Sequence, residues 1–161
     1  EIMPSLVGSE MCIRDSINKL IEASQAGVYI DMVVRGICCL RAGVPDETEN
    51  IHIISIVGRY LEHSRIYIFG QGERARYYIG SADWMTRSTL RRVEIAAPVT
   101  APALKARLQH IFDTMLADNC NARVQQPDGS YVRRMPGADA VDCQAQFYEE
   151  AYQANVHSSL K

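Results

Sequence analysis

The sequence predicts an α/β domain with a mixed sheet flanked by helices, and three observations support this. The chain has 161 residues, of which 47% are hydrophobic and 22% charged, which suits one globular domain. Segment 28–34 is apolar and rich in β-branched residues, which is typical of a strand buried on both faces. A segment of helical periodicity precedes this strand across the single residue Gly27, and helix followed by strand is typical of α/β proteins.

The first third of the chain continues this alternation. A helix is predicted over residues 14–26, because apolar side chains recur at helical spacing from Ile17 onward. Residues 36–50 contain glycine, proline and acidic residues and predict an exposed loop, which is followed by a second apolar strand over residues 51–57. Loops beyond strand ends are where α/β proteins usually bind ligands.

The rest of the chain predicts further strands and two helices. Residues 65–69 and 75–81 are short strand-like runs with a glycine-containing connection, so we expect an antiparallel hairpin. The remaining expected elements are a strand over 93–98, a helix over 101–117 that covers one face of the sheet, a turn at 127–129, a short strand over 130–135 and a helix over 138–155.

Charge is unevenly distributed along the chain. The net charge is −2, so no overall field favours nucleic acid, and we expect no nucleic-acid partner. Residues 58–92, however, sum to +4 and contain seven arginines and no lysine. Arginine matches phosphate oxygens two at a time, which favours phosphate recognition. A solvated face with a few ion pairs explains the same charges equally well.

The cysteines and the apolar runs indicate the cellular compartment of the protein. The five cysteines are an odd number and form no C-x-x-C pair, so we expect reduced thiols and no zinc site. The longest apolar runs, 53–57 and 95–99, are far shorter than the roughly 18–20 residues of a membrane-spanning helix. We therefore expect a soluble, cytoplasmic protein without a transmembrane segment.

His63 and Arg65 are the first candidate site residues. They stand two positions apart next to a predicted strand, so both side chains can lie on one side of the backbone. An imidazole that titrates near neutral pH, beside a fixed cation, suits phosphoryl transfer. With Gly80-Ser81-Ala82-Asp83 downstream, the pattern resembles the phospholipase D signature, in which the His acts on phosphorus and the later residues bind phosphate. Gly70 stands where that signature has Asp, and Asp83 where it has Asn.

Longer strings point to one relative within that superfamily. VVRGICCLRAGVP at 33–45, ISIVGRYLEHSRIYIF at 54–69 and GSADWMTRSTLRRVE at 80–94 resemble the C-terminal catalytic domain of the large, phosphohistidine-forming polyphosphate kinases. The resemblance implies a phospholipase-D-like fold over residues 17–161. Residues 1–16 do not resemble the family, and we interpret them as an unmatched segment and a possible artefact.

The resemblance also implies an activity, which is reversible transfer of the terminal phosphate of ATP to polyphosphate. It assigns Arg35 to the nucleotide phosphates and His63 to acid or base assistance, with Arg65, Ser81 and Asp83 as further phosphate-binding candidates. It places the phosphorylated histidine and the Mg²⁺ ligands in domains that precede this one. Those missing N-terminal domains, ATP or ADP, polyphosphate and a second copy of the chain are the expected partners, and peripheral attachment to a membrane is compatible with it.

Two other functions remain open from the sequence. The chain could be a non-enzymatic module that binds phosphate or nucleotide, or two copies could pair their His-x-Arg motifs as a phosphodiesterase. Trp84 could stack on a base, although a single Trp more often anchors packing.

Overall fold

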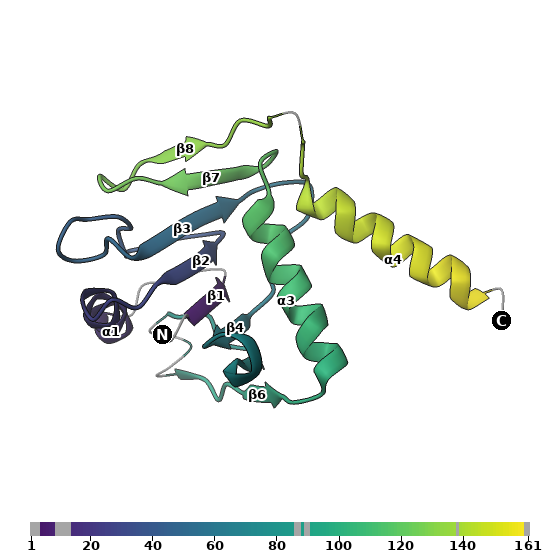
Figure 1. Cartoon of the computed structure of the whole chain (residues 1–161), viewed down its shortest axis with the longest axis horizontal. Coiled ribbons are helices and arrows are strands. Elements are labelled where there is room, and N and C mark those ends of the chain that lie inside the picture. Colours follow the sequence, from purple (N-terminus) through teal and green to yellow (C-terminus); the bar gives the residue numbers. More distant parts are fainter. Residues whose placement is uncertain (1–3, 9–13, 86–87, 89–90, 138, 160–161) are drawn as a thin grey trace.

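A computed structural model describes residues 4–8, 14–85, 88, 91–137 and 139–159. It contains one eight-stranded sheet in the order β6-β5-β4-β1-β2-β3-β7-β8 (Figure 1). The strands are β1 (Pro4–Gly8), β2 (Ile30–Val34), β3 (Ile51–Ile56), β4 (Ile66–Phe69), β5 (Arg76–Gly80), β6 (Ala96–Val99), β7 (Ala122–Gln125) and β8 (Tyr131–Arg133). The helices are α1 (Arg14–Gln25), the 3₁₀ turn η1 (Gly72–Arg74), α3 (Pro102–Ala117) and α4 (Cys143–Ser159).

The sheet has a parallel centre and antiparallel margins. Strand β2 pairs in parallel with β1 and β3, and Val33 lies between Val7 and Ile54 in this register. On one side, β4, β5 and β6 continue the sheet antiparallel, and on the other side β7 and β8 do so. The mixed α/β sheet predicted from the sequence is therefore confirmed.

Two apolar clusters cover the two faces of the central strands. Ile30, Met32 and Val34 of β2 belong to the cluster that includes Leu20 of α1. Val33 belongs to the opposite cluster, which includes Phe112 of α3. Because successive side chains of a strand point to opposite faces, a strand buried on both faces is a continuous apolar run. Helices α1 and α3 thus enclose the sheet from opposite sides (Figure 1).

Several elements differ from the sequence predictions. Strand β7 was not predicted, because its four residues include Arg123 and Gln125 and lack an apolar run. Helix α4 begins at Cys143 rather than at residue 138, and β6 begins at Ala96 rather than at residue 93. Strand β1 lies within residues 1–16, the segment interpreted above as unmatched and a possible artefact, and it occupies the middle of the sheet. The domain boundary after residue 16 stays a prediction.

Asp118 joins three elements at the end of α3. Its side chain is fully buried, and its Oδ1 accepts hydrogen bonds from the backbone N–H groups of Cys120 (3.1 Å), Asn121 (2.7 Å) and Ala122 (3.0 Å). Its Oδ2 accepts the N–H of Cys143 at 2.9 Å. One carboxylate therefore satisfies donors before β7 and at the start of α4, which fixes where α4 leaves the sheet.

Helix α4 projects away from the sheet and is tied to α3 partway along its length (Figure 1). Glu150 accepts hydrogen bonds from His110 Nε2 and from Arg107 Nη1, both at 2.7 Å. These bonds, that from His110 foremost, lower the pKa of Glu150 to about 2. No helix in the described part of the chain is long and apolar enough to cross a membrane.

We expect Asp118→Ala to lower the free energy of unfolding by about 3 kcal/mol, because it leaves the buried N–H groups of Ala122 and Cys143 without an acceptor. Urea unfolding measures the change. Asp113→Ala is the matched control, since Asp113 is exposed on α3 and, among the described residues, accepts a hydrogen bond from within the helix, from Gln109 at 2.7 Å. A loss for Asp118→Ala no larger than that of the control would contradict the role of Asp118.

The lowered pKa of Glu150 predicts a pH dependence of the α3–α4 contact. A carboxyl group whose folded pKa lies at about 2, below its usual 4.5, stabilises the fold above pH 4.5 and loses this effect as pH falls toward 2. The difference in melting temperature between the wild type and Glu150→Gln should therefore shrink from pH 5 to pH 2. Glu149→Gln, which changes an exposed residue bonded to Gln153 of the same helix, is the control. A difference that stays constant over this range would contradict the prediction.

Candidate functional site

The candidate residues lie along one edge of the sheet. Arg35 follows the carboxyl end of β2, and Val33 of β2 is aligned through β1 with Ile66, the first residue of β4. Ile66 in turn pairs with Ile79 near the end of β5. The register therefore brings Arg35, the His63–Arg65 segment and the Ser81–Asp83 segment to the same edge, which is where open α/β sheets bind ligands.

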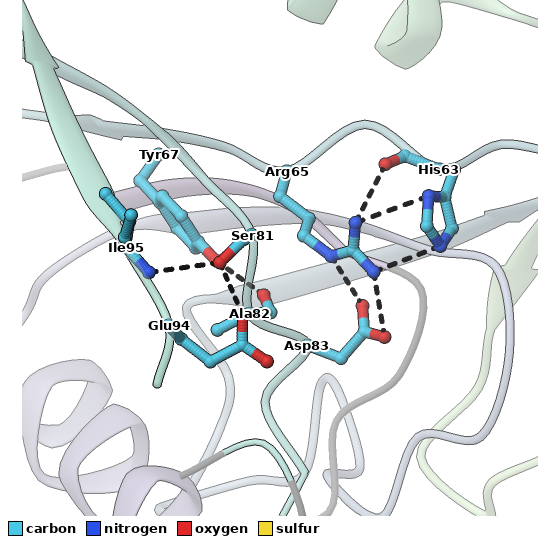
Figure 2. A network of polar contacts seen from close by, with 8 residues as sticks. All are labelled: His63, Arg65, Tyr67, Ser81, Ala82, Asp83, Glu94 and Ile95. Atoms are coloured by element: carbon cyan, nitrogen blue, oxygen red, sulfur yellow. Dashed lines mark hydrogen bonds and ion pairs between the residues drawn. The ribbon is translucent and has the colours of Figure 1, made fainter. Parts of the chain in front are cut away.

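Arg65 and Asp83 form a two-point ion pair at this edge (Figure 2). Arg65 Nε donates to Asp83 Oδ1 at 2.9 Å, and Nη2 donates to Oδ2 at 3.1 Å. The two side chains are only 12% and 11% exposed. The bond to Asp83 raises the pKa of the Arg65 guanidinium, so Arg65 remains cationic. Asp83 therefore holds Arg65 in a fixed orientation.

His63 lies against the other side of the same guanidinium. Arg65 Nη2 is 3.0 Å from His63 Nε2, and Nη1 is 3.3 Å from Nδ1 and 3.4 Å from the His63 carbonyl oxygen (Figure 2). Arginine only donates, so the ring nitrogen that accepts from it carries no proton. The expectation that the two side chains of the His-x-Arg motif lie together is confirmed. In this arrangement Asp83 orients Arg65, and Arg65 orients the exposed imidazole.

Ser81 forms its hydrogen bonds with residues of the connection between β5 and β6. Its hydroxyl donates to Glu94 Oε2 and accepts the N–H of Ile95 at 3.0 Å, while its own N–H donates to the Ile95 carbonyl at 3.0 Å (Figure 2). Both donors of Ser81 are thus used between β5 and β6. For Ser81 to donate to a phosphate, Glu94 would have to release the hydroxyl, and its phosphate-binding role stays a prediction.

Tyr67 contacts the Ser81–Asp83 segment through its hydroxyl. Burial raises the pKa of its hydroxyl, which donates to the Ala82 carbonyl at 3.0 Å. A Cβ at Gly80 would come within 2.8 Å of the Tyr67 ring, so the close approach requires glycine. Trp84 is partly buried and stacks on Tyr67 with ring centroids 6.2 Å apart. This contact makes Trp84 a packing residue of the domain.

Arg35 differs from Arg65 in its bonding. Its Nε is buried and has no hydrogen-bond partner among the described residues. A buried unpaired donor is costly in a folded protein, and a ligand that accepts from it removes that cost. Of the two arginines, Arg35 therefore keeps an unpaired Nε donor, whereas Arg65 is occupied by Asp83 and His63. Phosphate binding by Arg35 stays a prediction.

The other described arginines of the +4 segment do not join this cluster. They are exposed on the surface, and Arg76 stands at the opposite edge of the sheet, paired with Phe69. Arg59 lies over the ring of Tyr60 at 5.3 Å. Arg87 lies outside the described residues. The Arg65–Asp83 ion pair and the exposed arginines agree with a solvated face that carries a few ion pairs, and phosphate recognition by this segment stays a prediction.

The described residues offer no evident metal centre. No group of three or more His, Cys, Asp and Glu side chains among them could hold a metal ion. The buried carboxylate of the candidate site, Asp83, accepts a hydrogen bond from Arg65. The described cysteines, Cys38, Cys39, Cys120 and Cys143, form no disulfide, and burial raises the pKa of the Cys143 thiol, so it stays protonated. Cys12 lies outside the described residues.

The fold is that of a phospholipase-D-like domain. The solved structure of Nuc from Salmonella typhimurium, a phospholipase D family member, superposes with a TM-score of 0.58 at 13% identity over 77% of this chain and 82% of that one. At this identity the likeness concerns the fold alone.

The similarity to polyphosphate kinases is higher. The family model described as polyphosphate kinase C-terminal domain 2 matches residues 6–146. The chain therefore belongs to the polyphosphate kinase family, as this C-terminal domain. The crystal structure of polyphosphate kinase from Porphyromonas gingivalis superposes with a TM-score of 0.89 at 34% identity, over 96% of this chain and 24% of that one.

Full-length relatives are much longer than this chain. A polyphosphate kinase of Synechocystis is 54% identical over 136 residues, which are 84% of this chain and 18% of the relative. One of Bacillus anthracis is 49% identical over 138 residues, 85% of this chain and 20% of the relative. The chain thus spans about a fifth of the curated relatives that it matches.

Some contacts of the site have no signal in the sequence. The bond between Ser81 and Glu94 and the support of Ala82 by Tyr67 join residues that the sequence separates by 13 and 15 positions. Gln144, which contacts the His63 segment, lies more than 80 positions away. Only the spacing of His63 and Arg65 indicated their contact in advance.

We expect Asp83→Ala to lower the free energy of unfolding by about 3 kcal/mol, because it leaves the largely buried Arg65 cation without its partner. Equilibrium denaturation measures this loss. The control is Glu22→Ala, which removes the exposed Lys19–Glu22 pair (2.6 Å) and should cost less than about 1 kcal/mol. Equal losses for the two variants would show that Asp83 does not anchor Arg65.

Proposed function

We propose that this chain supplies part of the active site of an ATP–polyphosphate phosphotransferase, which reversibly transfers the terminal phosphate of ATP to polyphosphate. Membership of the polyphosphate kinase family supports the reaction class. One observation of the site carries the proposal for this domain: the unpaired Nε of Arg35 lies at the same sheet edge as the oriented His63 imidazole.

Arg35 and Arg65 would have different roles in the site. Arg35 would donate to phosphate oxygens of the nucleotide and neutralise their charge. Arg65 would hold the His63 ring. The proposed ATP- and phosphate-binding set remains Arg35, His63, Arg65, Ser81 and Asp83, with Asp83 acting through Arg65.

His63 would act on a proton during transfer. In the family the acceptor of the ATP phosphate is a histidine of another domain, so its P–N bond forms as the bond from phosphorus to the ADP oxygen breaks. His63 would donate a proton to, or hold, one of the transferring oxygens and recover it in the reverse direction. Its exposed ring at the sheet edge is accessible to a ligand for this purpose.

The described part of this chain has no group of three or more His, Cys, Asp or Glu side chains that could hold Mg²⁺. We propose that its ligands belong to the remainder of the full-length protein, as do the other domains that complete the site. A cytoplasmic location and assembly as a homo-oligomer are further parts of this proposal.

A phosphodiesterase formed by two copies has less support. Gly70, which stands where the phospholipase D signature has Asp, has a φ of +86° in the turn after β4. This left-handed conformation favours glycine and is strained for an Asp. A non-enzymatic binding module remains the second candidate, since the unpaired Arg35 donor fits binding as well as catalysis.

The full-length test uses a hybrid in which this chain replaces the segment that it matches in the Synechocystis polyphosphate kinase. We expect His63→Ala to lower the rate of phosphate transfer from ATP by about 100-fold or more, since loss of general acid–base assistance has this size. Transfer of labelled terminal phosphate measures it, and circular dichroism checks the fold. Near-normal turnover would contradict the role of His63.

Calorimetric titration of the 161-residue chain with ATP separates enzyme from module. We expect the chain to bind ATP, Arg35→Ala to abolish this binding and Arg76→Ala to leave it intact. This result would support an ATP site at Arg35 for the phosphotransferase and for the binding module alike. The Arg76 control removes the same charge at the opposite edge of the sheet. If the hybrid binds ATP at Arg35 but transfers no phosphate, the module is the correct function.

A further inference from the structure

The segment that carries His63 is held from a distant part of the chain. Residues 57–65 connect β3 to β4 without helix or strand. Tyr60 and Leu61 within it are 44% and 69% exposed, so the segment has little packing of its own. Its firmest described contact on the N-terminal side of His63 comes from Gln144, in the first turn of α4.

Gln144 binds this segment with its whole amide group. Its side chain is buried, at 5% exposure. Oε1 accepts the N–H of Tyr60 at 2.9 Å, and Nε2 donates to the Tyr60 carbonyl at 2.9 Å and to Glu62 Oε1 at 2.6 Å. The amide thus satisfies both backbone groups of one residue, as a neighbouring strand would, and also fixes the side chain directly before His63.

Gly58 makes this approach possible. A Cβ at residue 58 would lie 2.5 Å from Oε1 and 3.0 Å from Cδ of Gln144. Any side chain there would displace the buried amide, so the segment and Gln144 fit only with glycine at this position.

The element behind Gln144 is itself fixed at two points. Asp118 accepts the N–H of the preceding residue, Cys143, at 2.9 Å. Further along α4, Glu150 is bonded to α3 through His110 and Arg107. Gln144 therefore transmits the position of a rigid helix to the His63 segment, while Arg65 holds the ring from the other side.

We propose that Gln144 is a positioning residue for His63, which acts by clamping the backbone of Tyr60 and the carboxylate of Glu62. This inference rests on the proposed role of His63. Without the clamp, residues 57–62 gain freedom and the Glu62 carboxylate is released next to the imidazole. A displacement of about 1 Å in such a group is enough to slow a reaction by about 100-fold.

The first test follows the 161-residue chain by NMR. In Gln144→Ala we expect the Tyr60 amide to exchange about tenfold faster or more, because it loses its acceptor, and the His63 ring signals to shift. Gln153→Ala is the matched control, since Gln153 is an exposed glutamine of the same helix that bonds Glu149 at 2.6 Å. Unchanged Tyr60 exchange and His63 signals in Gln144→Ala would overturn the proposal.

A second variant covers the case in which Gln144→Ala does not fold. Gly58→Ala keeps the amide but pushes it from its place, and it should give the same two spectral changes. The pair Gln144→Glu with Glu62→Gln exchanges the carboxylate and the amide between the two positions. It should partly restore the wild-type His63 signals, because the carboxylate then at position 144 can accept from the Tyr60 N–H and from the amide at position 62. Restoration no better than in Gln144→Glu alone would count against the clamp.

The hybrid kinase then separates positioning from binding. Gln144→Ala should lower kcat about tenfold or more and change KM for ATP by less than about twofold, because Arg35 stays in place. A normal kcat together with shifted His63 signals would refute the positioning role. Failure of the proposed function is a different result, since it would leave His63→Ala fully active whatever Gln144→Ala does.

Discussion

Burial of β2 and β3 on both faces is the constraint on which the rest of this domain depends. Ile30, Met32 and Ile53 are fully buried, so a charged side chain in their place would lose its hydration without gaining a partner. The polar groups that do occur within these strands bond inside the protein, as His52 Nδ1 and Asp31 do at 3.2 Å. Groups that meet a ligand must therefore come from the strand ends and connections.

The site at that edge consists of an imidazole held in place by its neighbours, His63, and one unpaired donor, Arg35 Nε. Asp83, Arg65 and His63 form a chain of contacts in which each side chain fixes the next. Arg35 stands apart with a buried donor that nothing in the described structure accepts. This difference in bonding, rather than charge, distinguishes the arginine that orients a neighbouring side chain from the arginine whose Nε donor is unpaired.

Much of the fold followed from local patterns. Helices α1 and α3, strands β2 and β3 and the β4–β5 hairpin were predicted because periodicity and turn residues act over a few positions. Strand β7 was not, because a short strand that contains Arg123 and Gln125 owes its state to pairing with β3. The bond between Asp118 and Cys143 and the role of Gln144 were invisible for a similar reason, since each depends on a partner brought close by folding.

The sequence by itself determined the α/β class, the family and the contact between His63 and Arg65, because these rest on composition, motif strings and a spacing of two residues. Only the tertiary structure decided that Arg65 is occupied by Asp83 while Arg35 keeps an unpaired donor, and that Gln144 holds the segment of His63. Such assignments depend on which groups satisfy one another in space. A hydrogen bond between residues 84 positions apart leaves no periodicity in the chain that forms it.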